Sequence, residues 1–130
     1  MIVVDASVVL EVLLRTPDAD LIERRLFAPR ESLYAPHLLD VEVAQVVRRY
    51  YLHGEITGDR GAEALCDLAD MPIERFPHTD FLPRIWELRN NLTSYDAAYV
   101  ALAETLGCNL LTRDHRLANS PMYTASVEAV

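Results

Sequence analysis

After Met1 the chain continues with Ile2-Val3-Val4-Asp5-Ala6-Ser7, an apolar run that meets an acid and then a helical pattern. An uninterrupted run of β-branched residues is typical of a parallel strand buried on both faces, and it predicts a strand over residues 2–5. The helical pattern runs from Ala6 to Arg15 and stops before Pro17. We therefore expect Asp5 at the carboxyl edge of a parallel sheet, where α/β proteins bind their ligands.

The rest of the chain repeats this alternation. Apolar runs predict further strands at residues 32–35, 73–76 and 109–112, and an edge strand at 122–125. Helical spacing, with stops at Gly54 and Gly107, predicts helices at residues 17–27, 36–53, 58–71, 80–90, 93–106 and 113–118. Strands that alternate with helices favour an α/β fold: a three-layer α/β/α sandwich with a central parallel sheet.

Size and composition favour one intracellular domain. The chain has 130 residues, 51% of them hydrophobic, which is enough for one core, so we assign residues 1–130 to a single domain. No apolar run approaches the roughly 20 residues of a membrane span, and the first residues lack the basic flank of a signal peptide. Cys66 and Cys108 form no disulfide framework, so we expect free thiols, a cytoplasmic location and no membrane contact.

The charge is acidic and contains no lysine. The formal net charge is −8, and all 12 basic residues are arginine. Net charge alone does not indicate a nucleic-acid binder. The absence of lysine disfavours phosphoacceptor signalling domains and aspartate-nucleophile phosphatases, because both normally place a lysine beside the phosphoryl group.

Four acids stand at the ends of predicted elements or beside a buried helix face. We call them the acid quartet: Asp5, Glu42, Asp96 and Asp114. Three of them have a simpler explanation as helix caps or first-turn acids, with Thr93 and Asp96 forming a capping box. Glu42 is harder to explain in this way, because its neighbours Val43 and Val46 are apolar and unpaired carboxylates are rare beside a core.

Electrostatics sharpens the interpretation. Two carboxylates about 4 Å apart at an effective dielectric near 20 repel by roughly 4 kcal/mol, so converging acids require a cation. Hard oxygen donors are the ligands that Mg²⁺ or Mn²⁺ prefers. Such an ion activates water and holds a phosphate oxygen, which points to a phosphodiester-cleaving enzyme.

Four stretches add a family resemblance: Val3-Val4-Asp5-Ala6-Ser7, Leu39-Asp40-Val41-Glu42-Val43, Ser94-Tyr95-Asp96-Ala97-Ala98-Tyr99-Val100-Ala101-Leu102-Ala103 and Leu111-Thr112-Arg113-Asp114-His115-Arg116-Leu117. In order and over nearly the whole chain they resemble the motifs of PIN-domain ribonucleases, nearest to the VapC-type toxins of bacterial toxin–antitoxin pairs. The resemblance implies a PIN-like fold.

The resemblance also implies an activity, an endoribonuclease dependent on Mg²⁺ or Mn²⁺. The acid quartet matches the family's metal-binding and catalytic acids, and Ser7 and Thr112 match hydroxyl positions that hydrogen-bond within the site. The implied reaction is hydrolysis of an RNA phosphodiester by a metal-activated water, which leaves a 5′-phosphate and a 3′-hydroxyl. One departure is that His115, Arg116 and Leu117 follow Asp114, where many relatives carry another acid.

Partners follow from the same resemblance. They are a structured RNA such as a tRNA, a cognate antitoxin that places a basic side chain among the acids, and a second copy of the chain in a homodimer. Arg113 and Arg116 flank the last acid and are the first candidates for RNA contacts. Leu38, Tyr51 and Leu52 are assigned either to the core or to a subunit face.

Two alternatives remain open at this stage. The first is a catalytically silent PIN-like module that binds RNA or protein. The second is a histidine-pair ribonuclease using His115, which would work in EDTA and release a 2′,3′-cyclic phosphate. The histidines show no i, i+4 pairing of the kind that forms a helical zinc site.

Overall fold

A computed structural model gives the structure of the chain and describes residues 1–119 and 123–130. Its centre is a five-stranded sheet in the order β3-β2-β1-β4-β5. The strands are β1 (Ile2–Val4), β2 (Leu33–Pro36), β3 (Ile73–Phe76), β4 (Asn109–Thr112) and β5 (Val127–Ala129). Every neighbouring pair is parallel, as the sequence predicts.

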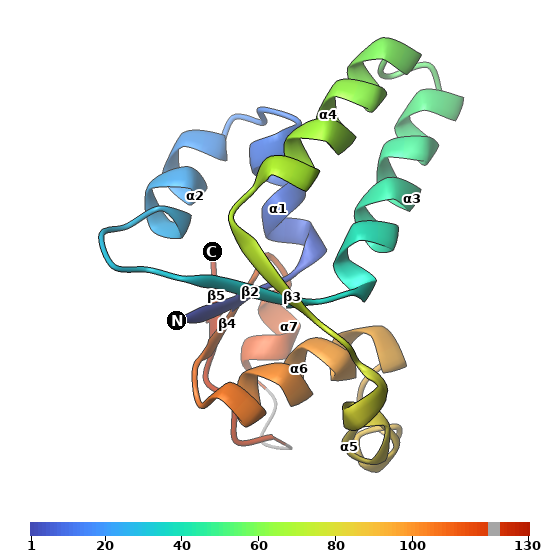
Figure 1. Cartoon of the computed structure of the whole chain (residues 1–130). Coiled ribbons are helices and arrows are strands. Elements are labelled where there is room, and N and C mark those ends of the chain that lie inside the picture. The colour runs from blue at the N-terminus through green and yellow to red at the C-terminus, as the bar shows by residue number, and fades with distance from the viewer. Residues whose placement is uncertain (120–122) are drawn as a thin grey trace.

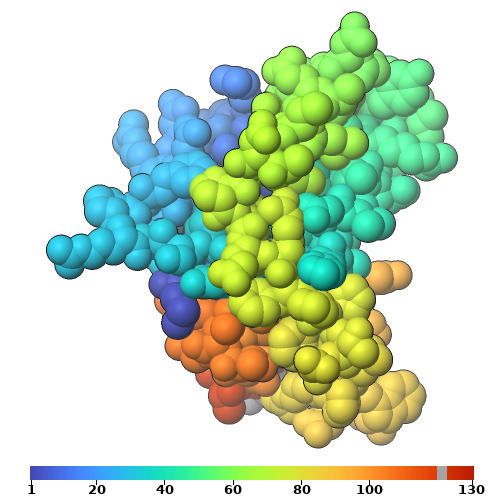
Figure 2. Space-filling view, in the orientation of Figure 1, coloured from blue at the N-terminus to red at the C-terminus, as the bar shows by residue number. Residues whose placement is uncertain are grey.

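The helices form two layers around this sheet. They are α1 (Ala6–Leu13), α2 (Ala19–Leu26), α3 (Leu38–Leu52), α4 (Gly58–Asp70), the short 3₁₀ helix η1 (Thr79–Phe81), α5 (Leu82–Glu87), α6 (Ser94–Leu106) and α7 (His115–Ala118). Figure 1 shows α1 to α4 on one face of the sheet and α5 to α7 on the other. The predicted three-layer sandwich is therefore confirmed. In the space-filling view α3 and α4 project together from the body of the molecule (Figure 2).

The strand order reverses at β1, which lies between β2 and β4 although it comes first in the chain. Val4 is in register with Leu111, and the amide of Asp5 donates to the carbonyl of Leu111 at 3.3 Å. Asp5 and the end of β4 therefore meet at the carboxyl edge, at the point where ligands of such sheets bind.

The core is centred on β1 and α6. All three residues of β1 are buried, and in α6 every residue from Ala97 to Ala103 is buried as well. Small side chains in α6 allow it to lie close under β1, β2 and β4, which it contacts. The end of this helix is fixed by Gly107, which adopts a left-handed conformation with φ +64°.

The predicted edge strand at residues 122–125 is wrong where it can be compared. Residues 123–125 are not a strand, Met122 lies outside the described residues, and the edge strand is β5 at Val127–Ala129. β5 is held by a contact that local pattern does not reveal: Arg25 of α2 donates to both carboxylate oxygens of Glu128, at 2.8 Å each.

The predicted helix at residues 80–90 is divided. Its start is the 3₁₀ turn η1, and α5 follows with Pro83 in its first turn, where a missing amide costs least. Among the residues that the structure describes, no helix has the length and apolar character needed to cross a membrane.

Candidate active site

Asp5 occupies the junction of β1 and α1 and is only 8% exposed. One carboxylate oxygen accepts hydrogen bonds from Ser7 Oγ at 2.5 Å and from the amide of Val8 at 3.2 Å, and the other accepts from Thr112 Oγ1. Burial raises the pKa of Asp5, while these three donors act in the opposite direction. Asp5 is thus a helix cap and also a buried carboxylate with fixed oxygens.

The hydroxyls of Ser7 and Thr112 extend this arrangement to the far end of the site. Ser7 Oγ accepts from the amide of Arg113 at 2.9 Å, and Thr112 Oγ1 accepts from the amide of Asp114 at 3.0 Å. Each hydroxyl therefore donates to Asp5 and accepts from the segment after β4. This pair links the first acid of the quartet to the loop that carries the last.

Glu42 reaches the site from α3 and is half-buried. Its Oε1 accepts a hydrogen bond from the hydroxyl of Tyr99 at 2.7 Å. Burial raises the pKa of Glu42; the Tyr99 hydrogen bond lowers it, and the charges of Asp5 and Asp96 raise it further. Glu42 therefore experiences the charges of two other members of the acid quartet.

Asp96 lies in the first turn of α6. Its amide donates to the hydroxyl of Thr93, the N-cap residue, at 3.1 Å, so the capping role foreseen for this turn is present. The pKa of Asp96 is raised mainly by burial and also by the charge of Asp114, while Thr93 and Arg116 lower it. A capping role and a place in the site therefore coexist in this residue.

Asp114 differs from the other three acids. Arg116 donates to it from Nε at 3.1 Å, from Nη2 at 2.9 Å and from the backbone amide at 2.9 Å. The guanidinium holds the pKa of Asp114 below its usual range. This acid already has a cation beside it.

The donor set fits a hard divalent cation in type and charge. In residues 1–119 and 123–130, no arginine, histidine or amino terminus forms an ion pair with Asp5, Glu42 or Asp96. Over the same residues, no three His, Cys, Asp or Glu side chains are arranged to enclose an ion as they stand. The donors are therefore of the right type, but they do not form a closed metal site as they stand.

The two arginines proposed for RNA contact are engaged by acids. Arg113 pairs with Asp18 at 2.7 Å and with Glu11 at 3.7 Å, and Arg116 pairs with Asp114. The Arg116 side chain is nevertheless 91% exposed, so solvent and ligands can reach it. Their contact with RNA stays a prediction.

Two hollows flank the acid quartet. One, of about 440 Å³, is lined by Glu42 together with Gln45, Arg49 and Tyr95. The other, of about 270 Å³, is lined by Asp96 and Asp114 together with residues 91–93, Arg116 and Leu117. Members of the acid quartet therefore line both hollows.

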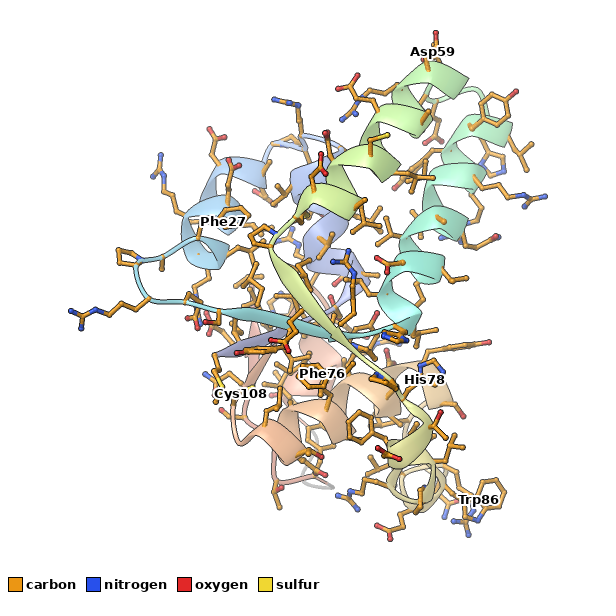
Figure 3. The ribbon with its side chains drawn as sticks, in the orientation of Figure 1. Phe27, Asp59, Phe76, His78, Trp86 and Cys108 are labelled. Carbon is orange, nitrogen blue, oxygen red and sulfur yellow. The ribbon has the colours of Figure 1, made fainter. Side chains whose placement is uncertain are left out.

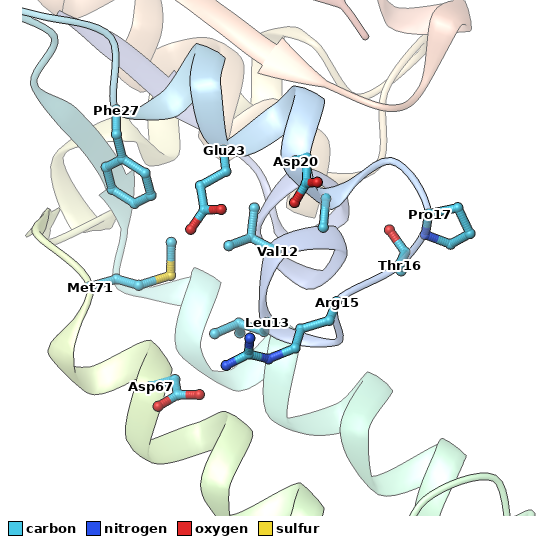
Figure 4. Close-up of a pocket in the computed structure, with 11 residues that line it drawn as sticks. Val12, Leu13, Arg15, Thr16, Pro17, Asp20, Glu23, Phe27, Asp67 and Met71 are labelled. Carbon is cyan, nitrogen blue, oxygen red and sulfur yellow. The ribbon is translucent and has the colours of Figure 1, made fainter.

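A hollow of about 590 Å³ lies elsewhere, between α1, α2 and α4 (Figure 4). Arg15, Glu23, Phe27, Asp67 and Met71 point into it, and no member of the acid quartet lines it. Its size does not make it the catalytic centre, because none of the carboxylates of the acid quartet lines it.

Two aromatic residues lie in contrasting places. Trp86 lies at the outer end of α5 and is 67% exposed (Figure 3). Tyr99, which the sequence does not single out, contacts Glu42. The signal for Tyr99 was its position, three residues after Asp96 in a helix of otherwise small and apolar side chains.

Comparisons with known proteins find a family profile and full-length relatives. The PIN domain profile matches residues 2–121. Ribonuclease VapC9 of Mycobacterium tuberculosis is 43% identical over 130 residues, which covers all of this chain and 98% of the relative. Ribonuclease VapC12 of the same organism is 39% identical, covering all of this chain and 99% of the relative.

Solved structures share the fold at low sequence identity. Mycobacterium tuberculosis VapC20, a toxin that cleaves the sarcin-ricin loop, aligns with a TM-score of 0.69 and 15% identity, covering 88% of this chain and 91% of that one. VapBC2 from Rickettsia felis, bound to a fragment of promoter DNA, aligns with a TM-score of 0.70 and 14% identity, covering 99% and 98%.

Proposed function

Because this chain belongs to the VapC-type ribonucleases of the PIN-domain family, we propose that its acid quartet holds Mg²⁺ or Mn²⁺ for the hydrolysis of RNA. Membership makes the chain an RNA-cleaving hydrolase of the toxin type. The ion, the roles of the single residues and the partners are our proposals.

One observation carries the metal proposal: Glu42 experiences the charges of Asp5 and Asp96, and within residues 1–119 and 123–130 no cation forms an ion pair with any of these three acids. Burial and mutual repulsion raise the pKa of Glu42, and burial raises the pKa of Asp5 and Asp96. An arrangement that disfavours its own negative charge gains free energy from a cation. Carboxylate oxygens without a guanidinium are ligands suited to Mg²⁺ or Mn²⁺.

The proposed mechanism assigns the chain's residues to binding and orientation. When bound, a divalent ion would supply a more acidic water and neutralise charge on the phosphate. Ser7, Val8 and Thr112 fix the Asp5 carboxylate, so that it does not have to be ordered when RNA arrives. A water oxygen attacks phosphorus, the bond to the 3′-oxygen breaks, and that oxygen takes a proton. The products are a 5′-phosphate and a 3′-hydroxyl.

RNA must be held by local positive charge, because the chain as a whole carries −8. Arg49 lines the hollow beside Glu42, and Arg113 and Arg116 stand at the other end of the acid quartet. Each could contact a phosphate, Arg113 and Arg116 after release from their acids. Few such contacts favour a structured RNA, for example a tRNA, whose shape adds to the affinity.

Two protein partners complete the proposal. An antitoxin with a basic segment is complementary to the unpaired acids of the site. A second copy of the chain is supported by apolar surface at the end of α3, where Tyr51 is 53% and Leu52 58% exposed. The cytoplasm is the proposed location, since Cys66 and Cys108 are free thiols.

The catalytically silent module remains the second candidate, because Arg116 already neutralises Asp114 and the quartet does not enclose an ion as it stands. RNA cleavage by purified protein in Mn²⁺ and in EDTA separates the two. We expect cleavage only with the ion, and fragments with 5′-phosphates. Cleavage that persists in EDTA and leaves a 2′,3′-cyclic phosphate would overturn the metal proposal. Absence of cleavage on every structured RNA would favour the silent module.

A further inference from the structure

Tyr99 joins two helices that lie on opposite faces of the sheet. It belongs to α6, and its hydroxyl donates to Oε1 of Glu42 in α3 at 2.7 Å. Figure 1 shows α3 and α6 on opposite sides of the strands. The hydrogen bond therefore links the two helix layers across the carboxyl edge of the sheet. The residues are 57 positions apart in sequence.

The choice of partner is unusual for a buried tyrosine. Tyr99 is 2% exposed, and its neighbours in α6 from Ala97 to Ala103 are buried and apolar. A buried hydroxyl needs one acceptor, and a backbone carbonyl would satisfy it without any charge. Here the acceptor is a carboxylate that already experiences the charges of Asp5 and Asp96. The hydroxyl therefore supports an acid in an unfavourable position.

The hydroxyl is also a dependable donor. Burial, followed by the charge and hydrogen bond of Glu42, raises the pKa of Tyr99 above its ordinary value. A phenol already carries its proton at neutral pH, so the hydroxyl can donate to the carboxylate. A hydrogen bond from a neutral donor to a carboxylate orients the acid without cancelling its charge.

The two oxygens of Glu42 consequently differ. Oε1 is taken by Tyr99, whereas Oε2 accepts no hydrogen bond from the described part of the chain. In Asp5, by contrast, both oxygens accept hydrogen bonds. Glu42 therefore keeps one oriented oxygen available for a ligand.

We propose that Tyr99 is a positioning residue that fixes the Glu42 carboxylate in one orientation and leaves Oε2 for the divalent cation. This inference rests on the proposed function. Partners that orient a metal ligand through a hydrogen bond typically change metal affinity or activity 10–100-fold when they are removed. We therefore expect an effect of roughly that size for the loss of one oxygen atom.

The test measures Mn²⁺ binding to the RNA-free full-length chain by titration calorimetry, so that it does not depend on activity. Tyr99→Phe removes only the hydroxyl, and we expect Mn²⁺ affinity to fall about 10–100-fold while the far-ultraviolet circular dichroism stays the same. Tyr34→Phe is the matched control, because Tyr34 is half-buried in β2, packs on Phe76 and makes no hydrogen bond through its hydroxyl within the described residues. Equal affinities for the Tyr99 and Tyr34 variants would overturn the proposal.

A double-variant cycle shows whether Tyr99 acts through Glu42. On a Glu42→Gln background the acid to be positioned is gone, so Tyr99→Phe should change Mn²⁺ affinity much less than it does in the parent chain. In RNA cleavage, excess Mn²⁺ should restore the rate of Tyr99→Phe, which a general loss of structure would not allow. An undiminished effect in the Gln background would assign Tyr99 a role independent of Glu42 and overturn the proposal.

Three further outcomes are decisive. If Tyr99→Phe does not fold, Glu42→Asp withdraws the carboxylate from the Tyr99 hydroxyl by one methylene, and we expect a comparable loss of affinity; parental affinity would overturn the proposal. A parent chain that binds no Mn²⁺ would overturn the proposed function together with this role. Normal Mn²⁺ binding by the Tyr99 variant, with loss in Asp5→Asn, would overturn the positioning role alone.

Discussion

The two ends of the acid quartet hold a carboxylate in different ways. At the Asp5 end, two hydroxyls and an amide donate to a buried side chain. At the Asp114 end, a guanidinium pairs with an acid whose side chain is 30% exposed. Neutral donors orient a carboxylate and leave its charge unbalanced, whereas Arg116 balances the charge. A fold can thus prepare one ligand for a metal ion while it keeps another occupied until the ion or RNA arrives.

The largest expected effect comes from removing the unbalanced charge at the Asp5 end. Asp5→Asn should lower RNA cleavage at least about 100-fold, because it removes a proposed ligand and not merely a supporting group. The fold should persist. The NH2 group of the new asparagine would face one of the groups that donate a hydrogen bond to Asp5, which costs about 1 kcal/mol. The measurement is cleavage in Mn²⁺, with Asp59→Asn at the start of α4 as a remote control (Figure 3). Retained activity in Asp5→Asn would mean that Asp5 is not a metal ligand, and the contrast between the two ends of the acid quartet would lose its basis.

Metal binding should stabilise the parent chain. At a cation concentration 100 times the dissociation constant, the free energy of unfolding rises by about 2.7 kcal/mol. Urea unfolding with Mn²⁺ and with EDTA measures this difference. We expect a much smaller gain in Asp5→Asn. An equal gain in both proteins would place the ion away from the acid quartet.

Glu42→Gln should stabilise the cation-free protein at neutral pH, by on the order of 1 kcal/mol. The pKa of Glu42 is raised in the folded state, chiefly by burial, so its contribution to stability is complete below the ordinary pKa of glutamate and is lost as the pH rises through the raised value. The advantage of the variant over the parent should accordingly grow from about pH 4 to pH 7. Urea unfolding across this range in EDTA is the measurement, and a constant difference would contradict the raised pKa.

Arg116→Gln tests the other end and should have the smallest effect. Without the guanidinium, Asp114 has no paired cation, like the other three acids of the quartet. Mn²⁺ affinity should therefore increase a few-fold, while the stability of the cation-free protein changes little. Arg89→Gln is the control, since Arg89 lies over the ring of Trp86 at 4.5 Å, donates to the Trp86 carbonyl and forms no ion pair with the acid quartet within the described residues. Weaker Mn²⁺ binding in Arg116→Gln would instead mean that Arg116 helps to hold the site together.

The parts of the site that follow a strand were predictable from sequence. Asp5 comes directly after β1, and Asp114 follows β4 with one residue between, so parallel strands bring them to one edge whatever their side chains contact. Strands β3 and β4 have the predicted bounds and helix α6 ends at the predicted residue, because periodicity and the stop at Gly107 specify them locally.

Contacts between distant segments were not predictable. The bond from Tyr99 to Glu42 spans 57 positions, and the Arg25 clamp on Glu128 spans 103. No local period encodes such pairs, so the edge strand was assigned too early in the chain and Tyr99 was overlooked. The pairing of Arg116 with Asp114 is local, but the sequence equally allowed the arginine to point toward RNA.

The central place of β1 has a consequence for synthesis of the protein. β1 lies between β2 and β4, and the Asp5 carboxylate receives the hydroxyl of Thr112, 107 positions later. A nascent chain therefore cannot complete this edge until its last quarter has left the ribosome. A polypeptide still tethered to the translation machinery, surrounded by ribosomal and transfer RNA, has its first acid but not the segment that orders it. Assembly order thus delays the moment at which the acid quartet is complete.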